Sequence, residues 1–291
     1  MVKHLLTLKD YSGDWIDGMI DKAIKIKSNS GKYGNILKNK TLVMLFEKAS
    51  TRTRCSFEAG MTQLGGHAIF LDWETTQLKK ASLKDEIRCI EKYSDVIMAR
   101  VFKHETLMEM AKYMEKPLIN ALSDLYHPCQ TVSDLMTIKE KKGKLNGLKL
   151  AYVGDGNNVC NSLIVGCKKV GMKIAVATPK GYEPKEKPDL LTQDPKEAVK
   201  DADIVYTDTW VSMGQEDEAE KRKKIFYPYQ INKELMKLAK KDALFMHCLP
   251  AYRGCEVTDD VIDSKQSVVF EQAENRMHAQ KAVILKLLGK I

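Results

Sequence analysis

Short apolar runs alternate with helical stretches along nearly the whole chain, and this alternation restricts the fold more than any other feature. The runs are rich in Val, Ile, Leu and Phe, and in the first half they cover residues 41–46, 68–71, 95–99 and 117–121. In the second half they cover 148–154, 173–178, 203–207, 243–248 and 267–270. Because a helix between two successive strands carries the chain back to the same end of a sheet, the pattern predicts an α/β fold with parallel sheets.

A chain of 291 residues is longer than one hydrophobic core usually supports, so we expect two domains. The first begins with an amphipathic helix over 15–27 and ends in a helix over 127–142, which a charged segment follows. We place the domain boundary after residue 142. The second half repeats the alternation of strands and helices and finishes in a helix from about Gln272 onward.

Composition argues against several classes of protein. No run of about 18 uncharged apolar residues occurs, and Asp10 interrupts the start of the chain, so we expect a soluble, cytoplasmic protein without a membrane segment. Seven cysteines without a Cys-x-x-Cys pair fit a reducing compartment better than disulfides or a zinc site. The net charge of +8 could indicate a nucleic-acid-binding protein, but no basic stripe interleaved with aromatic residues supports that alternative.

In open parallel sheets, ligands bind beyond the carboxyl ends of the strands, so the polar residues directly after each run are the candidates for a site. The first run is followed by Ser50, Thr51, Arg52, Thr53 and Arg54, which lead into a helix. Amide groups at a helix start, hydroxyl donors and two guanidinium groups together suit a phosphate dianion. The alternative is an ordinary capped helix with solvated arginines.

Three further polar residues are expected at the same sheet edge. Arg100 follows the run 95–99, and His127 and Gln130 begin the helix after the run 117–121. An imidazole and an amide can donate to a polarised carbonyl oxygen or accept from an amide, so these side chains suit a small ligand that carries both groups. For His127 alone, a capping or packing role is the simpler interpretation.

In the second half, Gly154-Asp155-Gly156 follows a strand and opens a helix, as a dinucleotide-binding loop would. No third glycine stands at the expected position, so a nicotinamide-dependent dehydrogenase is the weaker interpretation. Asn157 and Asn158 instead offer amide donors suited to a carboxylate.

Two later segments also follow strands. Asp208, in an Asp-x-x-x-Ser-Met-Gly segment, offers a negative charge for an ammonium group, although a polar loop around a packed Trp210 would explain it equally. Cys248, within His247-Cys248-Leu249-Pro250, is a candidate nucleophile. The adjacent His247 would point to the opposite face of the strand, so a local Cys/His pair is geometrically poor.

Taken together and in this order, these segments resemble the motifs of the aspartate and ornithine carbamoyltransferases. The matches are Ser-Thr-Arg-Thr-Arg at 50–54, His-Pro-Cys-Gln at 127–130, Asp-x-x-x-Ser-Met-Gly at 208–214, His-Cys-Leu-Pro at 247–250 and Arg276 in the last helix. The resemblance runs essentially end to end. It implies two doubly wound parallel-sheet domains, a carbamoyl-phosphate-binding domain 1–142 with helix 272–291 packing back on it, and an ornithine-binding domain 143–271.

The resemblance also implies a role for each matching residue. Carbamoyl phosphate would contact Ser50, Thr51, Arg52, Thr53, Gln77, Arg100, His127, Gln130, Cys248, Leu249 and Arg276, of which Arg100, His127 and Cys248 would be catalytic. Ornithine would contact Asn158, Asp208, Ser212 and Met213. The segment 74–88 departs from the family pattern, and Gln77 is matched there to a glutamine that in some members reaches the phosphate from a neighbouring subunit.

Because the Asp-x-x-x-Ser-Met-Gly segment is typical of the ornithine branch, the resemblance implies carbamoyl transfer to the side-chain amine of ornithine, a step of arginine biosynthesis, without a cofactor or metal. The nearest alternative is a carbamoyltransferase for another amine, such as putrescine or an acylated ornithine, which would have no use for residues that hold a free α-amino acid head. Family members are built on trimers, so we expect a homotrimer or a multiple of it, with no nucleic-acid or membrane partner.

Overall fold

The computed structural model describes residues 3–211 and 216–291. The chain forms two compact units, one made of Met1–Met136 with Glu274–Ile291 and the other of Thr137–Ala273. The chain passes between the units inside two helices, α5 (Pro128–Lys142) and α11 (Val269–Leu287). Our expected limits at residues 142 and 271 differ slightly from these, because a boundary inside a continuous helix carries no loop signal.

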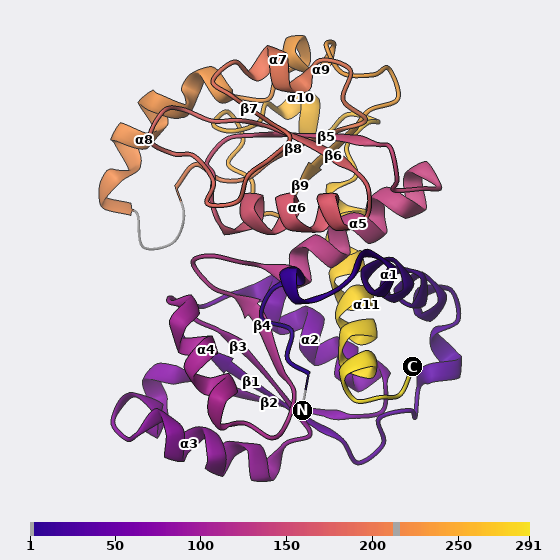
Figure 1. Ribbon diagram of the computed structural model, residues 1–291, viewed down its shortest axis with the longest axis vertical. Coiled ribbons are helices and arrows are strands. Elements are labelled where there is room, and N and C mark those ends of the chain that lie inside the picture. The colour runs from indigo at the N-terminus through magenta and orange to yellow at the C-terminus, as the bar shows by residue number, and fades with distance from the viewer. Residues whose placement is uncertain (1–2, 212–215) are drawn as a thin grey trace. The chain divides into compact units, whose positions relative to one another are not determined.

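Unit 1 is built on a four-stranded parallel sheet in the order β2-β1-β3-β4. The strands are β1 (Thr41–Phe46), β2 (His67–Asp72), β3 (Val96–Arg100) and β4 (Leu118–Leu122). Helices α3 (Leu83–Ile90) and α4 (His104–Tyr113) lie on one side of the sheet, and α1 (Gly13–Ser28), α2 (Thr51–Gln63) and α11 lie on the other (Figure 1). Both faces of the sheet are therefore covered, as strands with continuous apolar runs require.

The core of unit 1 follows from the alternation of side chains along a strand. Val43 and Leu45 of β1 and Ile97 of β3 point to one face, where they pack with Leu107 and Met110 of α4. All five are buried. Burial of this kind holds β1 and β3 side by side at the centre of the sheet.

Unit 2 is built on a five-stranded parallel sheet in the order β7-β6-β5-β8-β9. The strands are β5 (Lys149–Val153), β6 (Lys173–Ala177), β7 (Leu190–Thr192), β8 (Ile204–Thr207) and β9 (Leu244–His247). Helix α6 (Asn158–Lys169) covers one face, and α7 (Pro195–Val199), α9 (Lys233–Met236) and α10 (Asp259–Ile262) cover the other (Figure 1). Helix α8 (Ala219–Phe226) follows the segment that the structure does not describe.

The strand order creates one topological switch point in each sheet. In unit 1 the chain leaves β1 toward β2 but places β3 on the other side of β1. In unit 2 it leaves β5 toward β6 but places β8 on the other side of β5. Loops diverge above the carboxyl ends of such strand pairs and leave room for a ligand. The segments after β1, β3, β5 and β8 therefore define where each unit can bind one.

The expected fold class, two parallel-sheet α/β domains, is confirmed, and so are eight of the nine expected strands. The strand expected over 267–270 is wrong: Ser267 makes one isolated bridge to Phe245, and α11 begins at Val269, before the expected Gln272. Strand β7 was not expected, because it has three residues and Leu191 is exposed.

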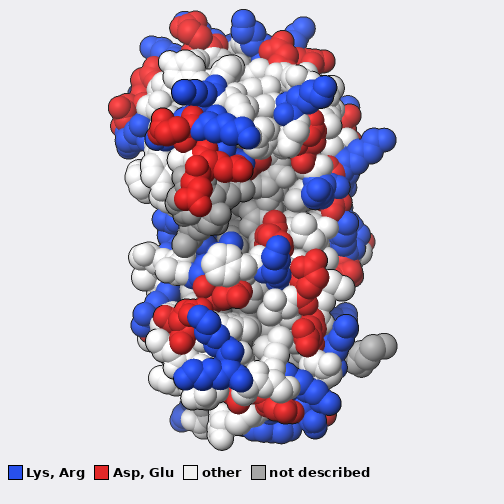
Figure 2. Space-filling view, turned by 90° about the vertical axis from the view of Figure 1, so that its left-hand side faces the viewer, with Lys and Arg blue, Asp and Glu red and all other residues white. Residues whose placement is uncertain are grey.

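Two features of the whole chain bear on its partners. Among the residues that the structure describes, no helix is long and apolar enough to cross a membrane. On the face shown in Figure 2, the described Lys and Arg side chains are interspersed with Asp and Glu side chains, and no continuous basic stripe crosses it.

Candidate active-site residues

The segment after β1 forms a capped helix start at the switch point of unit 1. Ser50 is the N-cap of α2: its Oγ accepts a hydrogen bond from the Thr53 N–H at 3.3 Å and donates to Thr53 Oγ1 at 3.1 Å. Thr53 is buried, Arg52 is half-buried and Thr51 is exposed. The positive end of the 13-residue helix and these side chains lie together in the way that an anion site requires, and their role in binding stays a prediction.

A buried basic cluster lies in the same unit. Arg100 ends β3, His127 directly precedes α5, and Arg276 comes from α11; all three are less than a tenth exposed. Burial, followed by the positive charges of Arg276, Arg100 and Arg52, lowers the pKa of His127 well below 6.5. His127 is therefore a neutral imidazole near neutral pH, which can donate one hydrogen bond without carrying charge.

Gln130 connects this cluster to the interior of α5. Its Oε1 accepts a hydrogen bond from Nη1 of Arg276, a residue far along the chain, and its Nε2 donates to Oδ1 of Asp134 at 2.7 Å. Gln130, Asp134 and Arg276 are all buried. The structure thus brings together four of the predicted residues, Arg100, His127, Gln130 and Arg276, around one buried region of unit 1.

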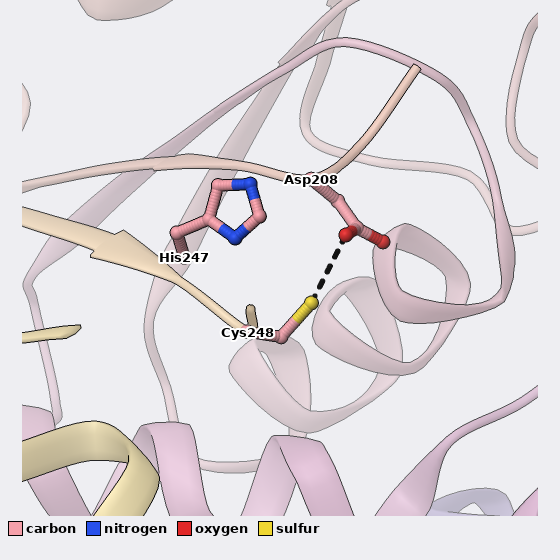
Figure 3. A group of neighbouring side chains, drawn as sticks. All are labelled: Asp208, His247 and Cys248. Carbon is pink, nitrogen blue, oxygen red and sulfur yellow. Dashed lines mark hydrogen bonds between the residues drawn. The ribbon is translucent and has the colours of Figure 1, made fainter. Parts of the chain in front are cut away.

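In unit 2, the carboxylate of Asp208 is held by neutral donors at the switch point. Cys248 Sγ lies 3.0 Å from Asp208 Oδ1 in a hydrogen bond (Figure 3), and the Thr209 N–H donates to the same oxygen at 2.8 Å. Asn157 Nδ2 donates to Asp208 Oδ2 at 2.8 Å. Asp208 is 6% exposed, so this carboxylate has a fixed orientation and a buried negative charge.

Asn157 makes two kinds of contact that the sequence analysis did not assign to it. Its Oδ1 caps α6 by accepting hydrogen bonds from the Val159 and Cys160 N–H groups at 3.0 and 3.1 Å, while its Nδ2 orients Asp208. The predicted residue Asn158 is the first residue of α6 and is half-buried. An Asn before a helix that follows a strand is a capping signal that could have identified Asn157.

His247 does not serve Cys248 as a base. Its Nδ1 accepts a hydrogen bond from the Leu249 N–H at 2.9 Å, and its Nε2 lies 3.3 Å from Glu256 Oε1, both groups being fully buried. Asp208, His247 and Cys248 do offer three ligand atoms within 4.8 Å of one another (Figure 3). A metal ion that took His247 Nδ1 as a ligand would displace it from the Leu249 N–H.

The remaining predicted residues fall outside these groups. Leu249 has a left-handed backbone, with φ of 57°, directly after Cys248. Gln77 lies exposed in the 3-10 helix Gln77–Lys79. Ser212 and Met213 lie outside the described residues.

A buried ion pair in unit 2 was not foreseen. Arg222 of α8 pairs with Asp155 after β5, and its Nε donates to the Trp210 carbonyl oxygen at 2.6 Å. Burial raises the pKa of Asp155 to about 6, the Asp208 carboxylate adds to the rise, and Arg222 opposes it. Arg222 thereby ties together the segments after β5 and β8.

Comparison with known proteins agrees with this geometry. Residues 3–140 match the family model "Aspartate/ornithine carbamoyltransferase, carbamoyl-P binding domain", and residues 146–287 match "Aspartate/ornithine carbamoyltransferase, Asp/Orn binding domain". The chain belongs to the aspartate/ornithine carbamoyltransferase family, a family of transferases. The resemblance inferred from the five motifs is therefore confirmed.

Relatives with this fold are similar over nearly their whole length. The chain is 52% identical over 306 residues to the ornithine carbamoyltransferase of Pyrococcus horikoshii, covering 99% of this chain and 96% of that protein. It is also 52% identical over 296 residues to that of Methanocaldococcus jannaschii, covering 96% and 97%. The solved ornithine carbamoyltransferase of Pyrococcus furiosus superposes with a TM-score of 0.94 at 51% identity, covering 99% of this chain and 98% of that one. That of Thermus thermophilus gives 0.91 at 43% identity, with 99% of each chain covered.

Proposed function

We propose that this chain transfers the carbamoyl group of carbamoyl phosphate to the δ-amine of L-ornithine, which yields L-citrulline and phosphate and serves arginine biosynthesis. The family assignment and the relatives named above support the reaction. The observation that carries the choice of acceptor is the Asp208 carboxylate. It is buried, oriented by three neutral donors, and followed by the Ser-Met-Gly segment, so a cationic α-amino group is the partner that suits it.

Carbamoyl phosphate belongs with unit 1 in this proposal. The start of α2, with Ser50, Thr51, Arg52 and Thr53, takes the phosphate, and Gln77 approaches it from the divergent loop of a neighbouring subunit. Arg100 and His127 donate to the carbonyl oxygen. Gln130 and Arg276 hold the carbamoyl group and phosphate from α5 and α11. A dianion compensates the buried positive charge of this cluster, which is why binding there is favourable.

Ornithine belongs with unit 2, where Asn158 faces its carboxylate and Asp208 with Ser212 and Met213 holds its α-amino end. The uncharged δ-nitrogen attacks the carbonyl carbon, and a C–N bond forms while the charge of the tetrahedral species collects on oxygen. The C–O bond to phosphate then breaks, the electron pair leaves with phosphate, and the proton of the nitrogen passes to a phosphate oxygen. Arg100 and His127 stabilise the oxyanion; Cys248 and the backbone of Leu249 position amine and carbamoyl group.

No step of this reaction requires a cofactor or a metal, since phosphate is a good leaving group once its charge is matched by arginine. We propose a homotrimer, or a multiple of it, in the cytoplasm, without nucleic-acid or membrane partners. The domain limits 1–142, with 272–291, and 143–271 follow the same division between the two substrates.

The test is carbamoyl transfer by the purified protein with carbamoyl phosphate and ornithine, run beside putrescine, aspartate and N-acetylornithine as acceptors. Selective formation of citrulline supports the proposal. Activity with another amine alone would keep the carbamoyl-phosphate half of the proposal and overturn the role of Asp208. Absence of transfer to any acceptor would overturn the proposed reaction.

A further inference from the structure

The buried carboxylate of Asp134 takes no part in the mechanism above, yet it touches the carbamoyl-phosphate residues. It lies on α5 one helical turn after Gln130, and Gln130 Nε2 donates to its Oδ1 at 2.7 Å. It is 0% exposed. Burial of a carboxylate lowers the stability of a protein unless hydrogen-bond and charge partners compensate for the lost solvation. A buried carboxylate at this position therefore suggests a functional role.

The two neighbours of Gln130 leave its amide one orientation. A guanidinium group only donates hydrogen bonds, so the atom of Gln130 that faces Arg276 must be Oε1. At the other end of the amide, Nε2 donates to the Asp134 carboxyl oxygen Oδ1. The oxygen and nitrogen ends of a side-chain amide are nearly indistinguishable by shape, so the orientation of an amide is assigned from its hydrogen-bond partners. For Gln130, the contacts at both ends agree with the same orientation.

We infer that Asp134 is a positioning residue for carbamoyl phosphate, which fixes the Gln130 amide and, through its Oε1, the Arg276 guanidinium. Without Asp134, the amide keeps its contact with Arg276 but loses the acceptor of Nε2, so one of the two contacts that fix its orientation is gone. Gln130 Oε1, and with it the Arg276 guanidinium, would then be held less firmly. The Gln130–Asp134 contact spans positions i and i+4 of one helix, a spacing at which Gln and Asp side chains meet.

This inference rests on the proposed function, and the experiment keeps the two apart by measuring binding without an acceptor. Calorimetric titration of the full chain with carbamoyl phosphate alone gives its Kd, and steady-state assays give KM for carbamoyl phosphate and for ornithine. Should the wild type bind carbamoyl phosphate but transfer it to no acceptor, the proposed function fails while the inference about Asp134 is still tested by the Kd values.

Asp134→Leu replaces the acceptor with a larger, branched apolar side chain and leaves Gln130 Nε2 buried, so we expect the Kd for carbamoyl phosphate to rise about tenfold or more, with the KM for ornithine nearly unchanged. Asp134→Asn still offers an oxygen, so we expect a rise of no more than about threefold. An unchanged Kd in Asp134→Leu, or equal damage in both variants, would overturn the inference.

A second pair of variants covers the case in which Asp134→Leu does not fold. Gln130→Glu sets two carboxylates against each other, and we expect it to weaken carbamoyl-phosphate binding. Adding Asp134→Asn supplies a donor to the new Glu, so the double variant should bind more tightly than Gln130→Glu alone. If Asp134 had a merely structural role, the double variant would bind carbamoyl phosphate no more tightly than Gln130→Glu. That result would overturn the inference.

Asp203→Asn is the matched control. Asp203 is also a buried carboxylate, 2.7 Å from Lys240 Nζ and 2.8 Å from the Lys149 N–H, but its partners all belong to unit 2. We expect its Tm to fall while its Kd for carbamoyl phosphate stays at the wild-type value. An equal loss of affinity in this control would mean that any buried charge disturbs the site, which would count against a specific role of Asp134.

Discussion

Asn157 donates a hydrogen bond from Nδ2 to Oδ2 of Asp208 at 2.8 Å, and this contact joins the segment after β5 to the segment after β8. Because the same side chain caps α6 through Oδ1, the orientation of its amide is fixed by the helix. The start of α6 thus sets the direction of the carboxylate that we propose for the α-amino group of ornithine.

Asn157→Asp should separate capping from orientation. Aspartate caps a helix as well as asparagine, but it would place a second carboxylate against Asp208. We expect the KM for ornithine to rise at least about tenfold, with little change in the Kd for carbamoyl phosphate. An unaltered KM for ornithine would show that the contact with Asp208 does not matter for the acceptor.

Arg100→Ala should act on turnover. Arg100 lies buried at the end of β3, where we propose that it donates to the developing oxyanion. Loss of one such donor typically lowers kcat by about 100-fold or more. Near-normal turnover in this variant, measured at saturating concentrations of both substrates, would remove Arg100 from the catalytic role.

His127 should make the folded chain less stable in acid. Its pKa in the folded state is lowered well below 6.5 by burial and three arginines, whereas in the unfolded chain it is ordinary. The unfolded state therefore takes up the proton first as the pH falls below 6.5, and stability is lost. We expect the Tm of the wild type to fall more than that of His127→Gln between pH 7.5 and pH 5.5. Parallel declines would contradict a neutral, buried His127.

Cys248 should orient the amine and not form a covalent bond. Cys248→Ser keeps a donor toward Asp208 Oδ1, while Cys248→Ala removes it. We expect kcat/KM for ornithine to fall about tenfold in the Ala variant and less in the Ser variant. Equal and nearly complete loss in both variants would instead support a covalent nucleophile.

The parts of the fold that could be predicted are those that depend on local burial. Strand β1 was expected over its exact residues because it is an uninterrupted apolar run between polar segments. The run 267–270 is also rich in apolar residues, but it makes one isolated bridge, between Ser267 and Phe245. Helix α11 begins at Val269 in spite of the β propensity of these residues. Strand β7 was missed more because it is short than because its composition differs from that of the other strands.

The parts of the site that could be predicted are those that stand directly after strands. Arg100 and Asp208 follow from the sheet rule alone. Asp155 and Arg222 could not be paired in advance, because Arg222 sits among lysines in a segment that reads as a solvated helix. Asp134 could have been found from its spacing to Gln130, but a carboxylate inside an apolar helix is normally interpreted as a solvated position.

Unit 1 is assembled from both ends of the described sequence, while unit 2 is continuous. A ribosome makes residues 274–291 after every residue of both sheets, so the second sheet can close while the first still lacks its final helix. Until α11 is complete, the acceptor oxygen of Gln130 has no Arg276 to hold. The newly made chain therefore completes the cluster that we propose for carbamoyl phosphate late in folding, and a chain released early would carry both sheets without the contact between Arg276 and Gln130.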